Sequence, residues 1–240
     1  MTKLNFEFQD SIISTNNVLK SDRSAQEGSV LIAGEQTQGK GMGSNQWESR
    51  KDENITGSIV LEPIFLEPSQ AFLISMAVSC GLIEFLSKFE IEAKIKWPND
   101  IYIDNKKIAG ILIENEFTSR QINKTIVGIG FNVNQEVFEH APNPTSLKIL
   151  TNHEHPVKML AEKLFEMVIN SYELLRVNKK VIMERYHNHL LGLNQYLLFD
   201  DENSKFAGKI KSVAEDGQIL IIDESRKEHK YYFKEVEMLL

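Results

Sequence analysis

Apolar and polar residues alternate in several short segments of this 240-residue chain, and the clearest case lies near its middle. Over residues 91–97 every second side chain is apolar, which is typical of a half-buried strand. The β-branched runs 101–103 and 108–113 flank Asp104 and Asn105, a pair that favours a tight hairpin turn. The pattern therefore predicts an antiparallel hairpin with a further strand in front of it.

Other segments show a helical period. From Pro68 to about Phe89 apolar residues cover a broad face, so we expect a long and well-buried helix there. Further helices are expected over 157–177, over 181–190 and in a short segment capped by Ser14, and further strands over 29–33, 55–63 and 124–133. This mixture of elements predicts an α/β (α+β) fold.

The pattern changes beyond Leu193. Short strand candidates follow one another at 196–199, 206–213, 218–222 and 230–233, with polar turns between them. Several short strands at this spacing predict a small barrel or meander. We therefore expect two domains, a larger one over residues 1–190 and a small β domain over residues 191–240.

Composition narrows the class of protein. The chain is 42% hydrophobic and 25% charged, as ordinary globular proteins are, and its net charge of -7 argues against a nucleic-acid partner. The single cysteine, Cys80, lies in an apolar helical run, which indicates a core side chain and excludes a disulfide framework or a thiolate zinc cluster. Neither a signal peptide nor an unbroken run of about 18 apolar residues is present, so we expect a cytoplasmic protein without membrane association.

The predicted hairpin would bring Asp100 and Lys107 close together on neighbouring strands. A lysine beside a carboxylate on a rigid ribbon suits chemistry at a phosphate or an acyl group. A surface ion pair is the alternative that the spacing leaves open.

A glycine-rich loop is the second candidate site. Residues 34–40 fit the GxxxxGK start of a phosphate-binding P-loop, but Gly41 replaces the hydroxyl residue that would hold magnesium. The glycines that follow also oppose the helix that should begin there. The loop can instead let its backbone approach an anion, with Lys40 as a point charge and Trp47 as a planar cover. A plain surface turn is the alternative.

Five blocks resemble, in the same order, the signature motifs of biotin protein ligases, the enzymes that attach biotin to lysines of carrier domains. The blocks are Ser14-Thr15-Asn16, the loop QTQGKGMGSNQW from Gln36 to Trp47, KWPND from Lys96 to Asp100 with KIAGIL from Lys107, GIGFNVN from Gly128, and Thr145-Ser146-Leu147. Together they cover roughly residues 12 to 150.

The resemblance implies a mixed-sheet catalytic domain of the biotin/lipoate ligase type, followed by a small SH3-like β-barrel. It implies ATP-dependent ligation of biotin, through biotinyl-5'-AMP, to a lysine of an apo biotin carboxyl carrier protein or domain. ATP and biotin would be the substrates and Mg²⁺ the metal; homodimer formation is left open. Because the chain begins close to Ser14, we expect a monofunctional ligase without the DNA-binding domain of regulatory members.

The resemblance also assigns roles to residues. The catalytic groups would be Lys107, Lys40 and Asp100. Biotin would be bound by Ser14, Thr15, Asn16, Gln36, Lys40, Gly41, Met42 and Lys107. ATP and the adenylate would be bound by Lys40, Trp47, Asn99, Asp100, Lys107 and Asn132. No dedicated metal site is implied, since Mg²⁺ would be held mainly by the nucleotide phosphates, with Asn132 as an added contact.

One position departs from the family pattern. Many members read GRGRRG in the loop, whereas here Lys40 stands for the first arginine and Met42 for the second. With fewer cations, other groups must compensate if the adenylate is retained. Two alternatives stay open: a lipoate or octanoate ligase or transferase of the same fold, and a non-catalytic biotin or adenylate binder. The His153-Glu154-His155 run has no third ligand near it in sequence and is not interpreted as a metal site.

Overall fold

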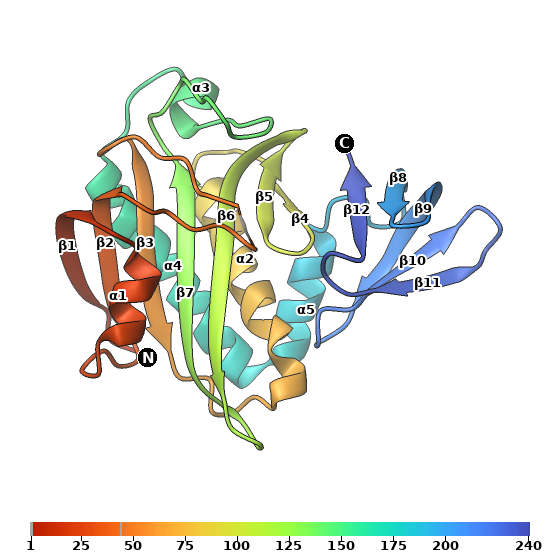
Figure 1. Cartoon of the computed structure of the whole chain (residues 1–240), viewed down its shortest axis with the longest axis horizontal. Coiled ribbons are helices and arrows are strands. Elements are labelled where there is room, and N and C mark those ends of the chain that lie inside the picture. Colours follow the sequence, from red (N-terminus) through yellow and green to blue (C-terminus); the bar gives the residue numbers. More distant parts are fainter. Residues whose placement is uncertain (1, 44) are drawn as a thin grey trace.

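The computed structural model describes residues 2–43 and 45–240 of the chain. Its larger sheet has seven strands in the order β1-β2-β3-β7-β6-β5-β4 (Figure 1). The strands are β1 (Asn5–Ile12), β2 (Ser29–Gln36), β3 (Asn54–Leu61), β4 (Lys94–Lys96), β5 (Asp100–Ile103), β6 (Lys106–Phe117) and β7 (Ile122–Asn132). β1 and β2 pair in parallel and the remaining neighbours are antiparallel, so the predicted mixed sheet is confirmed.

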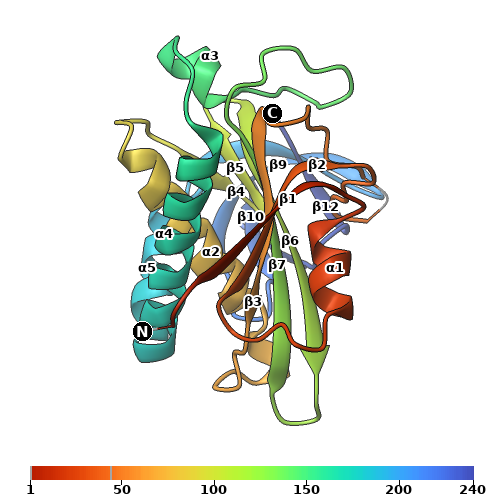
Figure 2. The same ribbon diagram turned by 90° about the vertical axis from the view of Figure 1, so that its left-hand side faces the viewer.

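Helices cover both faces of this sheet, as Figure 2 shows. The helix α1 (Thr15–Ser21) lies on one face, where it forms the crossover that the parallel pair β1 and β2 requires. The opposite face carries α2 (Phe72–Ser87), α4 (Val157–Val177) and α5 (Lys179–Asn188). Between the two layers β3 is buried along its whole length, as expected for a strand with both faces covered.

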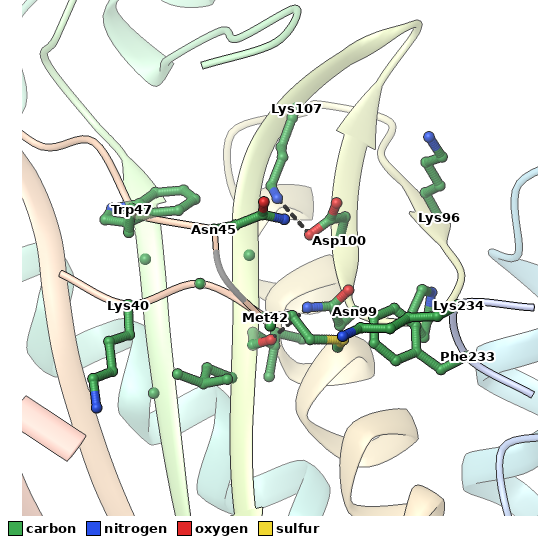
Figure 3. Close-up of a pocket in the computed structure, with 18 of the residues that line it drawn as sticks. Lys40, Met42, Asn45, Trp47, Lys96, Asn99, Asp100, Lys107, Phe233 and Lys234 are labelled. Carbon is green, nitrogen blue, oxygen red and sulfur yellow. Dashed lines mark hydrogen bonds and ion pairs between the residues drawn. The ribbon is translucent and has the colours of Figure 1, made fainter. Parts of the chain in front are cut away.

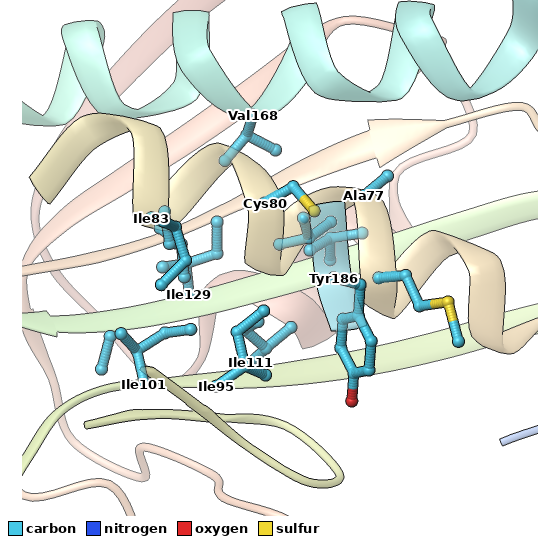
Figure 4. Packing of buried hydrophobic residues seen from close by; sticks show 14 of the residues in the cluster. Ala77, Cys80, Ile83, Ile95, Ile101, Ile111, Ile129, Val168 and Tyr186 are labelled. Carbon is cyan, nitrogen blue, oxygen red and sulfur yellow. The ribbon is translucent and has the colours of Figure 1, made fainter. Parts of the chain in front are cut away.

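The core lies between the sheet and α4, with α2 in the middle (Figure 4). Ile83 of α2 lies between Val168 of α4 and Ile129 of β7 in this stack. A Cβ on Gly81 would lie 2.7 Å from the Cα of Val168, so this glycine lets the two helices approach closely. Burial raises the pKa of Cys80 to about 12, which keeps the thiol protonated and agrees with its predicted place in the core.

The segment Pro68–Ser87, which contains the short 3-10 helix η1 (Pro68–Gln70) and α2, has the length and composition of a membrane span. The sequence did not predict such a segment, because Ser75, Ser79 and Gly81 interrupt its apolar run. In the structure 72% of the most apolar window is buried within the protein. Its apolar character is therefore explained by its place in the core.

The predicted hairpin is present. β5 and β6 are joined at Asp104 and Asn105, and Asp104 adopts the left-handed φ of 51° that such a turn uses. The strand in front of it is shorter than the alternation suggested, since β4 has three residues, although Ile95 and Trp97 are buried as predicted.

A five-stranded antiparallel sheet follows α5, in the order β11-β10-β9-β8-β12. Its strands are β8 (Tyr196–Asp201), β9 (Ser204–Val213), β10 (Ile219–Asp223), β11 (Glu228–Tyr231) and β12 (Val236–Leu239). The predicted small β region is confirmed as an antiparallel sheet, and its closure into an SH3-like barrel stays a prediction. This sheet is tied to the larger one by the Nε1 of Trp97, which donates a hydrogen bond of 3.0 Å to the carbonyl of Gly217.

Three elements were not predicted. The strand β1 carries an alternating pattern of its own, but Phe6 and Phe8 are its only aromatic residues and its other side chains are mostly polar, as an edge strand allows. The helix α3 (Leu147–Thr151) and the strand β12 are too short to give a periodic signal.

Candidate functional site

A cavity of about 680 Å³ lies between the glycine loop, the larger sheet and the C-terminal sheet. Its walls come from the start of α1, the loop that follows β2, the β4–β5 connection, the first half of β6, the second half of β7, and the segments 200–202 and 233–238. Small-molecule sites commonly have volumes of about 300–1,000 Å³. All the predicted site residues line this cavity except Asn132.

The pair predicted from the hairpin lies in the cavity wall. The Nζ of Lys107 lies 2.6 Å from Oδ1 of Asp100, and the two side chains are 25% and 21% exposed (Figure 3). Two further backbone hydrogen bonds fix the lysine: its N–H donates to the carbonyl of Asn143, and its carbonyl accepts from the N–H of Thr145. A partly buried cation on such a rigid support can meet an anionic or acyl group at a defined position.

Asn99, the residue before Asp100, fixes this part of the cavity wall through two hydrogen bonds to Ile111. The Nδ2 of Asn99 donates to the carbonyl of Ile111 at 2.7 Å, and the N–H of Ile111 donates to the carbonyl of Asn99 at 2.9 Å. Asn99 therefore attaches the KWPND segment to β6, while its side chain remains in the cavity wall. Lys96, from the same segment, also lines the cavity, and burial lowers its pKa.

The floor of the cavity contains two strand glycines that face Trp47. A Cβ on Gly130 would overlap the indole, and a Cβ on Gly110 would lie 3.2 Å from its ring. The Nζ of Lys107 lies 5.7 Å from the centre of the same ring. Glycine in a strand often marks close approach of another group. Here that group is the aromatic side chain that ends the glycine loop.

The glycine loop is held as a short irregular turn. Lys40 and Gln46 form an isolated bridge, and the N–H of Gly41 donates to the carbonyl of Asn45 at 2.8 Å. Ser44, the polar residue that follows Gly43 in this loop, lies outside the described residues. No helix begins within the described part of the loop, which agrees with the rejection of the P-loop interpretation.

The structure does not bring the two predicted catalytic lysines together. The Nζ of Lys40 donates to Oδ1 of Asn17 on α1 at 3.2 Å, and Figure 3 shows this side chain directed away from Lys107 and Asp100. The loop sequence predicted where the backbone of Lys40 lies, but it carries no information on the direction of a long, exposed side chain.

The Ser-Thr-Asn block forms a buried network at the start of α1. The N–H and the Oγ1 of Thr15 lie 2.7 and 3.1 Å from Oε1 of Gln36. Oγ of Ser58 lies 2.6 Å from both Oγ1 of Thr15 and Oδ1 of Asn16. The Nδ2 of Asn16 donates to Glu114 at 2.9 Å. These bonds hold Thr15, Asn16 and Gln36 in one arrangement at the end of the cavity opposite the C-terminal sheet.

Asn132 is placed differently from the other predicted residues. It is 3% exposed, and its Nδ2 donates to the carbonyl of Thr145 at 2.9 Å. Through this bond it supports the segment that pairs with Lys107. Its Oδ1 is buried without a hydrogen-bond partner among the described residues.

The contribution of the C-terminal sheet to the cavity was not predicted from the sequence. The segments 200–202 and 233–238 line the cavity, although they lie 70 or more residues beyond Gly130, the last residue of the other walls in sequence. These segments contain Phe233 and Lys234 and five carboxylates, Asp200, Asp201, Glu202, Glu235 and Glu237. No local motif marks them, because their place depends on how the second sheet is attached.

Comparison with known proteins gives a consistent result. The model of the Biotin/lipoate A/B protein ligase family matches residues 7–132. The bifunctional ligase/repressor BirA of Bacillus subtilis is 28% identical over 233 residues, covering 91% of this chain and 68% of that protein. Biotin–protein ligase 2 of Arabidopsis thaliana is 27% identical over 186 residues, covering 73% of this chain and 55% of that protein. The solved structure of the biotin protein ligase from Aquifex aeolicus in complex with biotin and ATP has a TM-score of 0.80 and 26% identity, covering 98% of both chains.

Proposed function

Because the chain belongs to the Biotin/lipoate A/B protein ligase family, we propose that it ligates biotin, with ATP, to a lysine of a biotin carboxyl carrier protein. The observation that carries this proposal is the Lys107–Asp100 pair, held at 2.6 Å in the wall of a cavity that the glycine loop and the Ser-Thr-Asn block also line. The similarity to a ligase solved with biotin and ATP supports the choice of substrates.

The first step joins two anions. A carboxylate oxygen of biotin attacks the α-phosphorus of ATP; a new P–O bond forms, the bond to the bridging oxygen breaks, and pyrophosphate leaves. Negative charge accumulates at the reacting centre, so a fixed cation lowers the barrier. We assign this role to Lys107, with Lys40 as a second cation once its exposed side chain turns from Asn17 to the ligand.

The second step transfers the acyl group. The carrier lysine attacks the carbonyl of biotinyl-5'-AMP as a free amine, a C–N bond forms, the C–O bond to phosphate breaks, and AMP leaves with the loss of a proton from nitrogen. We assign Asp100 to the orientation of this amine and to acceptance of its proton. Its carboxylate lies 2.6 Å from the Nζ of Lys107, the cation that we place next to the reacting centre.

The binding roles follow the walls of the cavity. We place biotin at the end formed by Ser14, Thr15, Asn16, Gln36 and the loop residues Lys40, Gly41 and Met42, and the adenylate between Trp47 and the Asn99–Asp100 corner. Gly110 and Gly130 leave room there for the indole of Trp47, whose flat face is a good partner for adenine.

Magnesium would enter with the nucleotide. Within residues 2–43 and 45–240 no group of three His, Cys, Asp or Glu side chains could hold a metal ion, whereas Mg²⁺ commonly relies on substrate phosphates and water. The buried Oδ1 of Asn132 is the added protein contact that we propose, since it has no other partner in the described chain. When bound, the ion neutralises phosphate charge during adenylation.

The broader organisation follows from the same proposal. We divide the chain into a catalytic domain, 1–190, and a C-terminal domain, 191–240, because α5 ends at Asn188 and β8 begins at Tyr196. The partner is the apo carrier protein, with homodimer formation as a further proposal. A net charge of -7 supports the absence of a nucleic-acid partner. We propose a cytoplasmic location.

One experiment separates this function from its alternatives. The protein is incubated with ATP, an apo carrier domain and either radiolabelled biotin or radiolabelled lipoate, and label on the carrier is measured. Transfer of biotin alone is expected. Transfer of lipoate would identify a lipoate ligase, and binding of biotin without transfer would identify a non-catalytic binder.

A further inference from the structure

Lys234 enters the cavity from the C-terminal sheet and reaches the glycine loop. A Cβ on Gly43 would lie 3.1 Å from the Nζ of Lys234, so the ammonium group lies next to the residue that follows Met42. Figure 3 shows the side chain extending from the C-terminal segment toward this part of the loop. Met42 occupies the position where the related loop sequence has an arginine. A cation is thus present beside Met42, but it comes from the other sheet.

The backbone at Lys234 has an unusual conformation. Its φ is +73°, in the left-handed region that glycine and asparagine adopt most easily. The turn that contains it joins β11 to β12 and is closed by the N–H of Glu235, which donates to the carbonyl of Tyr232. A lysine here is costly for the fold, which suggests a use for its side chain.

Two other lysines near the loop, Lys40 and Lys107, already have polar partners in the structure. The Nζ of Lys40 donates to Asn17, and the Nζ of Lys107 is paired with Asp100. Lys234 takes part in none of the ion pairs found among the described residues. The C-terminal wall around it is rich in carboxylates, which repel a nucleotide unless a cation faces the phosphate.

We infer that Lys234 supplies, from the C-terminal sheet, the cationic contact to the adenylate phosphate that Met42 cannot supply from the glycine loop. This inference rests on the proposed function. It gives the C-terminal sheet a direct part in retaining the intermediate, in addition to its part in forming the cavity wall.

The test compares lifetimes of bound biotinyl-adenylate. Labelled complex is formed on the full-length protein and chased with excess unlabelled biotin. Lys234→Gly removes the cation and suits the left-handed backbone, so the fold is retained. The control is Lys230→Gln, which removes one positive charge from an exposed position of β11 outside the cavity. The lifetime is expected to shorten by more than about threefold in Lys234→Gly and to stay unchanged in the control.

A second variant tests whether a cation at position 42 can replace the cation at position 234. Adding Met42→Arg to Lys234→Gly is expected to restore most of the lifetime, because the cation returns from the loop side. A smaller change in Lys234→Gly, an equal change in the control, or no restoration by Met42→Arg would each overturn the inference. The unmodified protein is measured first. If it forms no biotinyl-adenylate, the proposed function fails and this inference fails with it.

Discussion

The indole of Trp47 lies against Gly130, so closely that no side chain fits on this strand residue. The two residues come from different parts of the fold, since Trp47 ends the glycine loop and Gly130 lies near the end of β7. The contact fixes where the loop returns to the sheet. It also places an aromatic ring 5.7 Å from the Nζ of Lys107.

Gly130→Ala is expected to destabilise the protein by about 1–3 kcal/mol, the usual cost of forcing an extra carbon into a packed site. The free energy of unfolding is measured in urea. Because the steric conflict requires the indole, Gly130→Ala should cost much less in a Trp47→Ala background. An equal cost in both backgrounds would show that the alanine disturbs β7 itself.

Lys107→Ala is expected to reduce pyrophosphate release by the equivalent of more than about 2 kcal/mol of transition-state stabilisation. Adenylation brings two anions together, and Lys107 is the cation that the hairpin fixes in the cavity wall. The matched control is Lys106→Ala, since Lys106 is exposed and does not line the cavity. Near-normal release from folded Lys107→Ala would transfer the catalytic role to another residue, with Lys40 as the first to test.

The glycine loop is expected to be cut by trypsin at Lys40 in the free protein and to be protected by biotin with ATP. Lys40 is exposed in a loop without regular structure. Cleavage at Arg50 should be slower, because its N–H is bonded to Gln135. Arg226, in the exposed turn between β10 and β11, serves as the internal standard. Equal rates at Lys40 with and without ligand would exclude closure of the loop over the substrates.

The C-terminal sheet is expected to lose stability in acid through Asp223. The hydrogen bond with His229, together with those from Ser225 and the N–H of Lys227, lowers the pKa of this carboxyl well below its usual range. A carboxyl whose pKa is lower in the folded state stabilises the fold above its unfolded pKa, about 3.9, and loses that contribution as the pH falls through its folded pKa.

The prediction is tested with Asp223→Asn. Its thermal midpoint should lie below that of the unmodified protein at pH 7, and the two midpoints should converge as the pH falls below about 4. Asp104→Asn, at an exposed turn that accepts asparagine readily, is the control for the removal of one carboxylate. A constant difference across the pH range would mean that the loss at Asp223 is one of packing.

Local pattern predicted the parts of the site that are built by local structure. The β-branched runs on either side of Asp104 and Asn105 were sufficient to predict the β5–β6 hairpin. This hairpin in turn places Asp100 beside Lys107. The direction of the Lys40 side chain could not be predicted, because the partner of an exposed lysine depends on tertiary contacts that the local sequence does not show. Lys234 could not be predicted either, since its place in the cavity depends on the packing of a second sheet against the first.

The hydrogen bond from Trp97 to Gly217 spans 120 positions of the chain. During synthesis the tryptophan leaves the ribosome long before its acceptor does, and its buried indole N–H has no partner until the turn after β9 has formed. The KWPND segment, Lys96 to Asp100, therefore reaches its final arrangement only after nearly the whole chain has been made. We expect nascent chains that end before Gly217 to contain Lys107 and yet to form no adenylate.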